Sequence, residues 1–174
     1  MVEIGGRPLI GHTIGSALQV RNASRVIVAT DSEEIAAVAA DGGAEVIWSI
    51  QAASCGTERI AQLIDLIPGD VIVNWQADEF AVPPSAVELL IQDFRDEDRV
   101  VTLGSRCDAP RSLGESTVKI VCDRWGRAMY FSRASIPHRS EAHHGKDSRL
   151  AETLTHTGIY AYHRSSLQAF LGWD

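Results

Sequence analysis

Residues 71–80, VIVNWQADEF, constrain the fold more than any other part of the chain, because an apolar run ends there abruptly in two carboxylates, Asp78 and Glu79. A short apolar run is typical of a strand that helices bury on both faces. In open α/β sheets, ligands bind just beyond the carboxyl ends of such strands. Asp78 is therefore a candidate for handling a metal ion or a phosphate. From these residues alone it could equally be a solvated turn acid ahead of Pro83 and Pro84.

Length and charge narrow the class of protein. A chain of 174 residues is long enough for one domain with a core, so we expect a single domain over residues 1–174. The formal net charge is −7, and no basic run is interleaved with aromatic residues, so we expect no nucleic-acid partner. Three cysteines without a CxxC pair favour a reducing cytoplasm. No apolar stretch approaches about 18 residues, so we expect no membrane insertion.

The spacing of apolar residues predicts an alternation of helices and strands in the first half of the chain. We expect helices at 9–20, 33–40 and 55–67, and strands at 25–30, 45–48 and from 71 onward. This β–α–β order is typical of parallel strands. In the second half we expect strands at 100–105, 117–122, 128–131 and 157–162, and a polar loop at 139–150.

The segment SCGTER, residues 54–59, precedes one of the predicted helices. A small residue, a glycine, a hydroxyl and an arginine at a helix start suit an anion or a nucleotide, which exposed backbone N–H groups would bind. The same segment, with Glu58, also describes an ordinary helix N-cap.

Six segments stand in an order and spacing that resembles the 3-deoxy-manno-octulosonate cytidylyltransferases, the CMP-Kdo synthetases of lipopolysaccharide assembly. They are IGGRPLIGHTI, RVIVATDSEEIAAVAADGGAEV, SCGTERIAQLI, VIVNWQADEF, VKIVCDRWGRAMYFSRASIP and HTGIYAYHR. The resemblance covers nearly the whole chain. It implies an α/β fold of the nucleotide-diphospho-sugar transferase type, with a mostly parallel Rossmann-like sheet and flanking helices. It also implies a cytoplasmic homodimer and Mg²⁺-dependent transfer of a cytidylyl group from CTP to 3-deoxy-D-manno-octulosonate (Kdo).

The resemblance also assigns roles to residues of this sequence. Asp78 becomes the catalytic metal ligand, and its hard oxygen atoms suit Mg²⁺. Arg133 would grip the carboxylate of the sugar acid, although a surface salt bridge is the alternative. His156 and Tyr160, four apart on a predicted strand and therefore on one face, would contact Kdo hydroxyls; the alternative for His156 is a structural group. The implied nucleotide-binding residues are Cys55, Gly56, Thr57, Arg59 and Gln76, and Gln76 is expected to touch the sugar as well.

The sequence departs from the family pattern in ways that bear on activity. The family opens with a strand and a glycine- and arginine-rich loop for the CTP phosphates, and it supplies a second metal-binding aspartate beyond the point matching Asp174; neither has a counterpart here. We therefore expect an incomplete domain with little or no activity as the 174-residue chain. Ala77 and Phe80 replace a glycine and a proline of the family, and Cys55 replaces the serine of the family's SGT segment.

Two other functions remain open at this stage. An acylneuraminate cytidylyltransferase would use the same chemistry on sialic acid. A non-catalytic homologue with a binding or dimerisation role would account for the missing phosphate loop.

Overall fold

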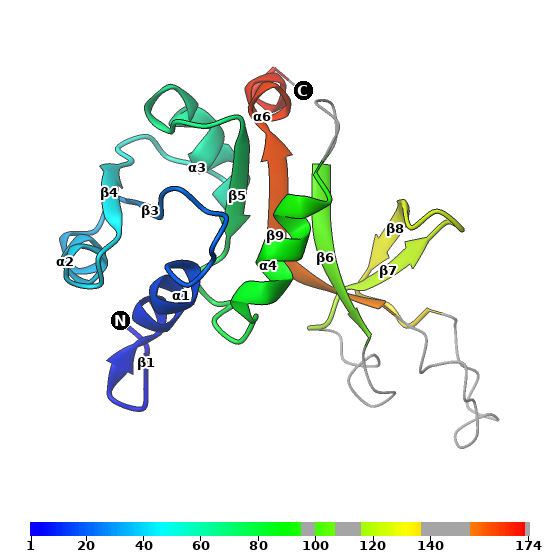
Figure 1. Cartoon of the computed structure of the whole chain (residues 1–174), viewed down its shortest axis with the longest axis horizontal. Helices are drawn as coiled ribbons and strands as arrows, with labels where there is room; N and C mark the ends of the chain where they lie inside the picture. The colour runs from blue at the N-terminus through cyan, green and yellow to red at the C-terminus, as the bar shows by residue number, and fades with distance from the viewer. Residues whose placement is uncertain (95–99, 107–115, 137–153, 173–174) are drawn as a thin grey trace. The chain divides into compact units, whose positions relative to one another are not determined.

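The computed structural model describes residues 1–94, 100–106, 116–136 and 154–172 (Figure 1). The chain divides into two compact units, a larger one of residues 1–101 and 158–174 and a smaller one of residues 102–157. The predicted loop at 139–150 lies outside the described residues. No helix in the described part of the chain is both long enough and apolar enough to cross a membrane.

The larger unit begins with a small antiparallel hairpin and a helix, and then forms a β–α–β unit. Its elements are β1 (Glu3–Ile4), β2 (Arg7–Pro8), α1 (Leu9–Ala17), β3 (Ile27–Thr30), α2 (Glu33–Asp41) and β4 (Glu45–Trp48). Strands β3 and β4 are parallel, as the sequence predicts. The Ser32 side chain caps α2 by accepting from the Ile35 N–H, and Gly43, at φ +89°, follows the helix end.

A small apolar core holds this part of the unit together. Ile14 of α1, Ala39 of α2 and Ala44 are buried in one cluster, and Val28 and Val46 of the two parallel strands pack against it. Fully burying a side chain the size of Ile14 contributes roughly 1.5–3 kcal/mol. The apolar faces of the helices and the strands that the sequence predicts therefore pack into one shared core.

The chain continues with α3 (Gly56–Gln62), a 3₁₀ turn η1 (Ile64–Leu66), β5 (Val71–Trp75) and α4 (Pro84–Gln92). The helix predicted over 55–67 is thus shorter, because Leu63 departs from helical geometry at φ −101° and ψ 8°. Helix α4 was not predicted, although Pro84 in its first turn is a common helix-start signal.

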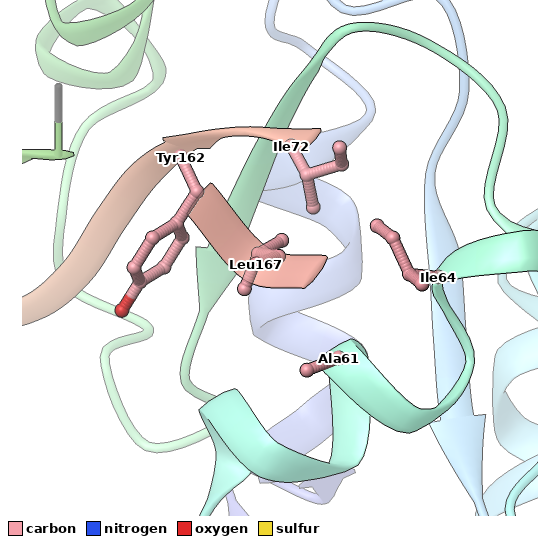
Figure 2. Close-up of a cluster of buried hydrophobic side chains, with 5 residues drawn as sticks. All are labelled: Ala61, Ile64, Ile72, Tyr162 and Leu167. Atoms are coloured by element: carbon pink, nitrogen blue, oxygen red, sulfur yellow. The ribbon is translucent and has the colours of Figure 1, made fainter. Parts of the chain in front are cut away.

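Strand β5 pairs antiparallel with the second half of β9 (Leu154–His163), so the parallel arrangement does not extend to this pair (Figure 1). The short helix α6 (Arg164–Phe170) follows β9 directly. A second core lies between these elements and α3, and Figure 2 shows its buried members Ala61, Ile64, Ile72, Tyr162 and Leu167. The first part of β5 is therefore anchored in this core through Ile72.

The smaller unit is built of antiparallel strands. It contains most of β6 (Val100–Arg106), the hairpin of β7 (Lys119–Cys122) and β8 (Ala128–Ser132), and the first half of β9. Strand β7 pairs with β8 and, at Lys119 and Ile120, with Thr155 and Leu154 of β9. The strands predicted for the second half of the sequence are confirmed, with β9 beginning earlier than expected.

Candidate active site

The turn that follows β5, residues 76–79, is held by a set of hydrogen bonds. The Glu79 N–H donates to the Gln76 carbonyl at 3.1 Å, and the Trp75 indole N–H donates to the Glu79 carbonyl at 3.0 Å. The hydroxyl of Thr13 in α1 donates to the Ala77 carbonyl at 2.6 Å. The Glu79 carboxylate accepts from the Gly158 N–H at 2.7 Å. Both ends of the turn are therefore fixed to neighbouring elements.

Asp78 is the exposed acid of this turn. Within the residues that the structure describes, its carboxylate makes no hydrogen bond or ion pair, whereas the adjacent Glu79 carboxylate is engaged. No non-glycine residue described has a positive φ, so Ala77 fits the turn without the backbone strain that replacing a glycine would otherwise bring. The turn, which hydrogen bonds hold in place, therefore presents one unengaged carboxylate, that of Asp78. Carboxylate oxygens are the kind of ligand that Mg²⁺ prefers.

Gln76 lies between two glycines. A Cβ added at Gly56 would come within 2.6 Å of Gln76 Nε2, and one added at Gly158 within 3.2 Å of Gln76 Cγ. The Gln76 amide also donates to Asn74 Oδ1 at 3.1 Å. Because β5 alternates, Asn74 and Gln76 point the same way, and the two glycines allow the Gln76 side chain to occupy this narrow space.

A polar network links the end of β5 to α3 and β9. The buried Asn74 donates to the hydroxyl of Thr57 at 3.3 Å, and that hydroxyl also lies 3.2 Å from the Tyr162 hydroxyl. Burial raises the pKa of Tyr162 and of Tyr160, whose ring stacks on Tyr162 at a centroid distance of 5.7 Å. Both phenols therefore stay protonated and able to donate hydrogen bonds at neutral pH.

The SCGTER segment forms a helix cap, as one of its two sequence interpretations predicts. The Cys55 side chain occupies the N-cap position of α3, and the Glu58 carboxylate accepts from both the hydroxyl and the N–H of Ser54 at 2.6 Å each. The Ser54 hydroxyl and then its N–H hold the pKa of Glu58 below its ordinary value. Arg59 forms an ion pair with Asp31 at 3.6 Å. The cap does not exclude a nucleotide, and the assigned roles of these residues stay predictions.

The two remaining sugar-site candidates lie in the smaller unit. Arg133 is exposed, and its guanidinium donates to the Ser116 carbonyl at 3.1 Å. The imidazole of His156 lies 2.8 Å from the Thr102 hydroxyl and meets the Phe131 ring edge-on at 5.3 Å. His156 is thus held by its neighbours in the manner of a structural histidine, which is one of the two interpretations that the sequence leaves open.

Within the larger unit, the structure brings the predicted residues Gly56 and Gln76 against each other. It also places Thr57 and Tyr160 next to Asn74, Thr57 through a hydrogen bond and Tyr160 as the partner of Asn74 in the β5–β9 pair. Among the described residues, no hydrogen bond or ion pair joins Asp78 to this group, and Asp78 follows Gln76 by two positions in the turn after β5. Arg133 and His156 belong to the smaller unit, so a common sugar site that includes them remains a prediction.

Two residues of importance were missed by sequence reasoning. The fully buried Lys119 donates from Nζ to the carbonyls of Thr117 and Arg133, and so fixes the backbone at Arg133. Glu79 was treated as a companion of Asp78, whereas its carboxylate holds β9 to the turn. The one sequence feature that points to the role of Lys119 is a charged residue in a strand of otherwise mostly apolar residues. No local sequence feature indicates the role of Glu79.

Comparison with known proteins gives a consistent picture. A family model described as cytidylyltransferase matches residues 1–172. The chain is 38% identical to the 3-deoxy-manno-octulosonate cytidylyltransferase of Chlorobium phaeobacteroides, over 98% of this chain and 69% of the relative. It is 34% identical to the protein of the same name in Pasteurella multocida, over 100% of this chain and 72% of the relative.

Solved structures agree with these relatives. The structure of CMP:2-keto-3-deoxy-manno-octonic acid synthetase complexed with CTP matches with a TM-score of 0.83 and 33% identity, over 99% of this chain and 70% of that one. A 4-diphosphocytidyl-2C-methyl-D-erythritol synthase from Anaerococcus prevotii matches with a TM-score of 0.63 and 11% identity, which shows a shared fold alone. The predicted nucleotidyltransferase type of α/β fold is confirmed.

Proposed function

The chain belongs to the cytidylyltransferase family, a family of nucleotidyltransferases, and from this premise we propose that it transfers the cytidylyl group of CTP to Kdo, for lipopolysaccharide biosynthesis. The similarity to 3-deoxy-manno-octulosonate cytidylyltransferases over 98% of the chain carries the proposal. The relatives that match the chain do not favour the acylneuraminate alternative. We further propose a homodimer that works in the cytoplasm.

The proposed reaction joins two anions. A hydroxyl of the sugar acid attacks the α-phosphorus of CTP, the bond to the β-phosphate oxygen breaks, and pyrophosphate leaves as the hydroxyl proton is lost. Catalysis then consists mainly of alignment and charge neutralisation. Gln76 and Tyr160 are suited to orienting neutral hydroxyl or amide groups, since both are half-buried and carry hydrogen-bond donors. Arg133 is suited to the carboxylate of the sugar acid.

Asp78 is our candidate for holding Mg²⁺, which when bound would neutralise phosphate charge. Among the described residues there is no group of three or more acidic, histidine or cysteine side chains placed to hold a metal. Mg²⁺ is often held by one or two carboxylates together with substrate phosphates, so a single unengaged carboxylate on a fixed turn fits the ion. The residues present therefore agree with a metal that enters with the nucleotide.

Calorimetry on the chain and two variants tests this proposal. We expect the chain to bind CTP in the presence of Mg²⁺ and to bind Kdo. We expect Asp78→Asn to weaken Mg²⁺-dependent CTP binding at least tenfold and to leave Kdo binding unchanged. The control Asp65→Asn, which neutralises another exposed acid of the same unit, should behave like the parent chain.

Three outcomes would count against the proposal, each in a different way. Binding of N-acetylneuraminate in preference to Kdo would identify the sialic-acid enzyme instead. Binding of neither CTP nor a sugar acid would identify a non-catalytic homologue. Unchanged CTP binding by Asp78→Asn would remove Asp78 from the metal site.

A further inference from the structure

The polar network of Gln76, Asn74, Thr57 and Tyr162 runs from the turn after β5 into the core. Gln76 Nε2 donates to Asn74 Oδ1 at 3.1 Å, and Asn74 Nδ2 donates to the Thr57 hydroxyl at 3.3 Å. The Thr57 hydroxyl lies 3.2 Å from that of Tyr162. Asn74 is 3% exposed and Tyr162 9%, so water cannot replace the bonds between the inner side chains.

The two amide groups give this network a direction, because an amide nitrogen only donates and an amide oxygen only accepts. With Asn74 Nδ2 directed at Thr57, the Asn74 oxygen is left for the nitrogen of Gln76. The Thr57 hydroxyl accepts from Asn74, and its own hydrogen is then available to the Tyr162 oxygen. The reverse direction would need both amides turned over and the Thr57 hydrogen given to Asn74. Every bond of the network therefore runs inward from Gln76.

The outer end of the network is the amide oxygen of Gln76. Gln76 Oε1 makes no hydrogen bond within the described residues. The buried side-chain atoms that lack a partner there are Ser49 Oγ and Gln62 Oε1, so Gln76 Oε1 is open to solvent. The nitrogen is the enclosed end, since a Cβ added at Gly56 would lie 2.6 Å from Nε2 and 3.2 Å from Oε1. The group that Gln76 presents outward is thus an acceptor.

We propose that the three inner members of the network are positioning residues. They hold the Gln76 amide with its nitrogen inward and its oxygen outward, so that Gln76 accepts a hydrogen bond from a substrate hydroxyl. The proposal rests on the function proposed above and specifies what Gln76 recognises. A group that only accepts, such as a carboxylate or a phosphate, cannot bond to this oxygen. Thr57, whose hydroxyl is engaged on both sides, then acts through Gln76 and not by touching the nucleotide.

Hydrogen exchange of side-chain amides, followed by NMR without substrate, tests the orientation. The signal lost in Gln76→Ala identifies Gln76 Nε2. One of its hydrogens should exchange at least tenfold more slowly than those of Gln92, which is exposed. Thr57→Val keeps the shape of the side chain but removes the hydroxyl, and it should bring exchange at Gln76 to the level of Gln92. Thr57→Ser keeps a hydroxyl and should keep exchange slow.

Two further variants separate this effect from a general loss of structure. Tyr162→Phe removes the acceptor of the Thr57 hydrogen and should also speed exchange at Gln76 several-fold. Thr155→Val removes another buried threonine hydroxyl, which donates to the Ser105 carbonyl in the smaller unit, and should leave exchange at Gln76 unchanged. Far-ultraviolet circular dichroism shows which variants remain folded, and either Thr57→Val or Tyr162→Phe alone suffices.

Calorimetry with CTP and with Kdo tests the role in binding and identifies the substrate that supplies the hydroxyl. Thr57→Val should weaken binding of one of the two at least tenfold and should have no further effect in a Gln76→Ala background. Analogues of the same substrate, each with one hydroxyl replaced by fluorine, supply the second test, because fluorine cannot donate. One analogue should bind the parent chain at least tenfold more weakly than the substrate, and this difference should vanish in Gln76→Ala.

Four results would overturn the positioning role. Fast exchange at Gln76 in the parent chain would mean that its nitrogen faces outward. Slow exchange that survives both Thr57→Val and Tyr162→Phe would mean that the amide is held without the network. A loss of binding by Thr57→Val that persists in the Gln76→Ala background would mean that Thr57 contacts the substrate itself. Undiminished binding of every fluorine analogue would mean that Gln76 accepts from no hydroxyl.

A failure of the proposed function would look different. Neither CTP nor Kdo would then bind to the parent chain at all, and the recognition of a substrate hydroxyl by Gln76 would fall with it.

Discussion

The carboxylate of Glu79 accepts a hydrogen bond from the backbone N–H of Gly158 at 2.7 Å, across 79 residues of sequence. This bond joins the turn after β5 to β9. It fixes the side chain of Glu79, the residue that directly follows the exposed Asp78. The geometry of the candidate metal ligand is therefore coupled to a residue of a different strand.

Glu79→Ala should lower the free energy of unfolding by about 1.5 kcal/mol, because a hydrogen bond to a charged group is lost from a half-buried position. It should also weaken Mg²⁺-dependent CTP binding although Asp78 is unchanged, since the turn loses one of its supports. Urea unfolding and calorimetry measure the two effects. Asp65→Ala, at an exposed position of the same unit, is the matched control and should change neither quantity. Normal CTP binding by Glu79→Ala would show that the turn holds its shape without this bond.

The sequence predicted the central part of this site but not its support. An apolar run that ends in an acid is a local pattern, so Asp78 at the end of β5 could be read from the sequence, and the structure confirms its place. The role of Glu79 depends on Gly158, and that of Lys119 on the carbonyl of Arg133; such long-range contacts leave no trace in local periodicity. The antiparallel pairing of β5 with β9 was hidden for the same reason, because strand order is set by tertiary packing.

Gly56→Ala should displace the amide of Gln76, because the added Cβ would lie 2.6 Å from Nε2. The atom that must move is the far end of a flexible side chain, so we expect little change in stability but a loss of the Gln76–Asn74 hydrogen bond and a several-fold weaker binding of substrate. Calorimetry with CTP and Kdo identifies which substrate is affected. In a Gln76→Ala background the same Gly56→Ala change should have no further effect, since the obstructing atoms are gone. Additive losses in the double variant would show that Gly56 acts independently of Gln76.

The ion pair between Glu88 and Arg21 should make stability depend on acid pH. Glu88 of α4 is 6% exposed, and it accepts from the backbone N–H of Arg21 at 2.9 Å and from its guanidinium at 2.7 Å. The guanidinium hydrogen bond is the main reason why the pKa of Glu88 falls from 4.5 to about 2. Because the folded pKa is depressed, the stabilisation is fully present above the unfolded value of 4.5 and is lost as the pH falls toward about 2.

Glu88→Gln removes the titrating group and keeps the shape of the side chain, so it should be less stable than the parent chain at neutral pH. The difference should shrink as the pH falls through this window, because protonation of Glu88 in the parent chain removes the same charge. Urea unfolding at a series of pH values from 7 to about 2 measures it, and the neutral-pH loss should not appear in Glu33→Gln, whose carboxylate is exposed in the first turn of α2. A difference that stays constant down to the lowest pH would mean that Glu88 contributes through packing and not through its charge.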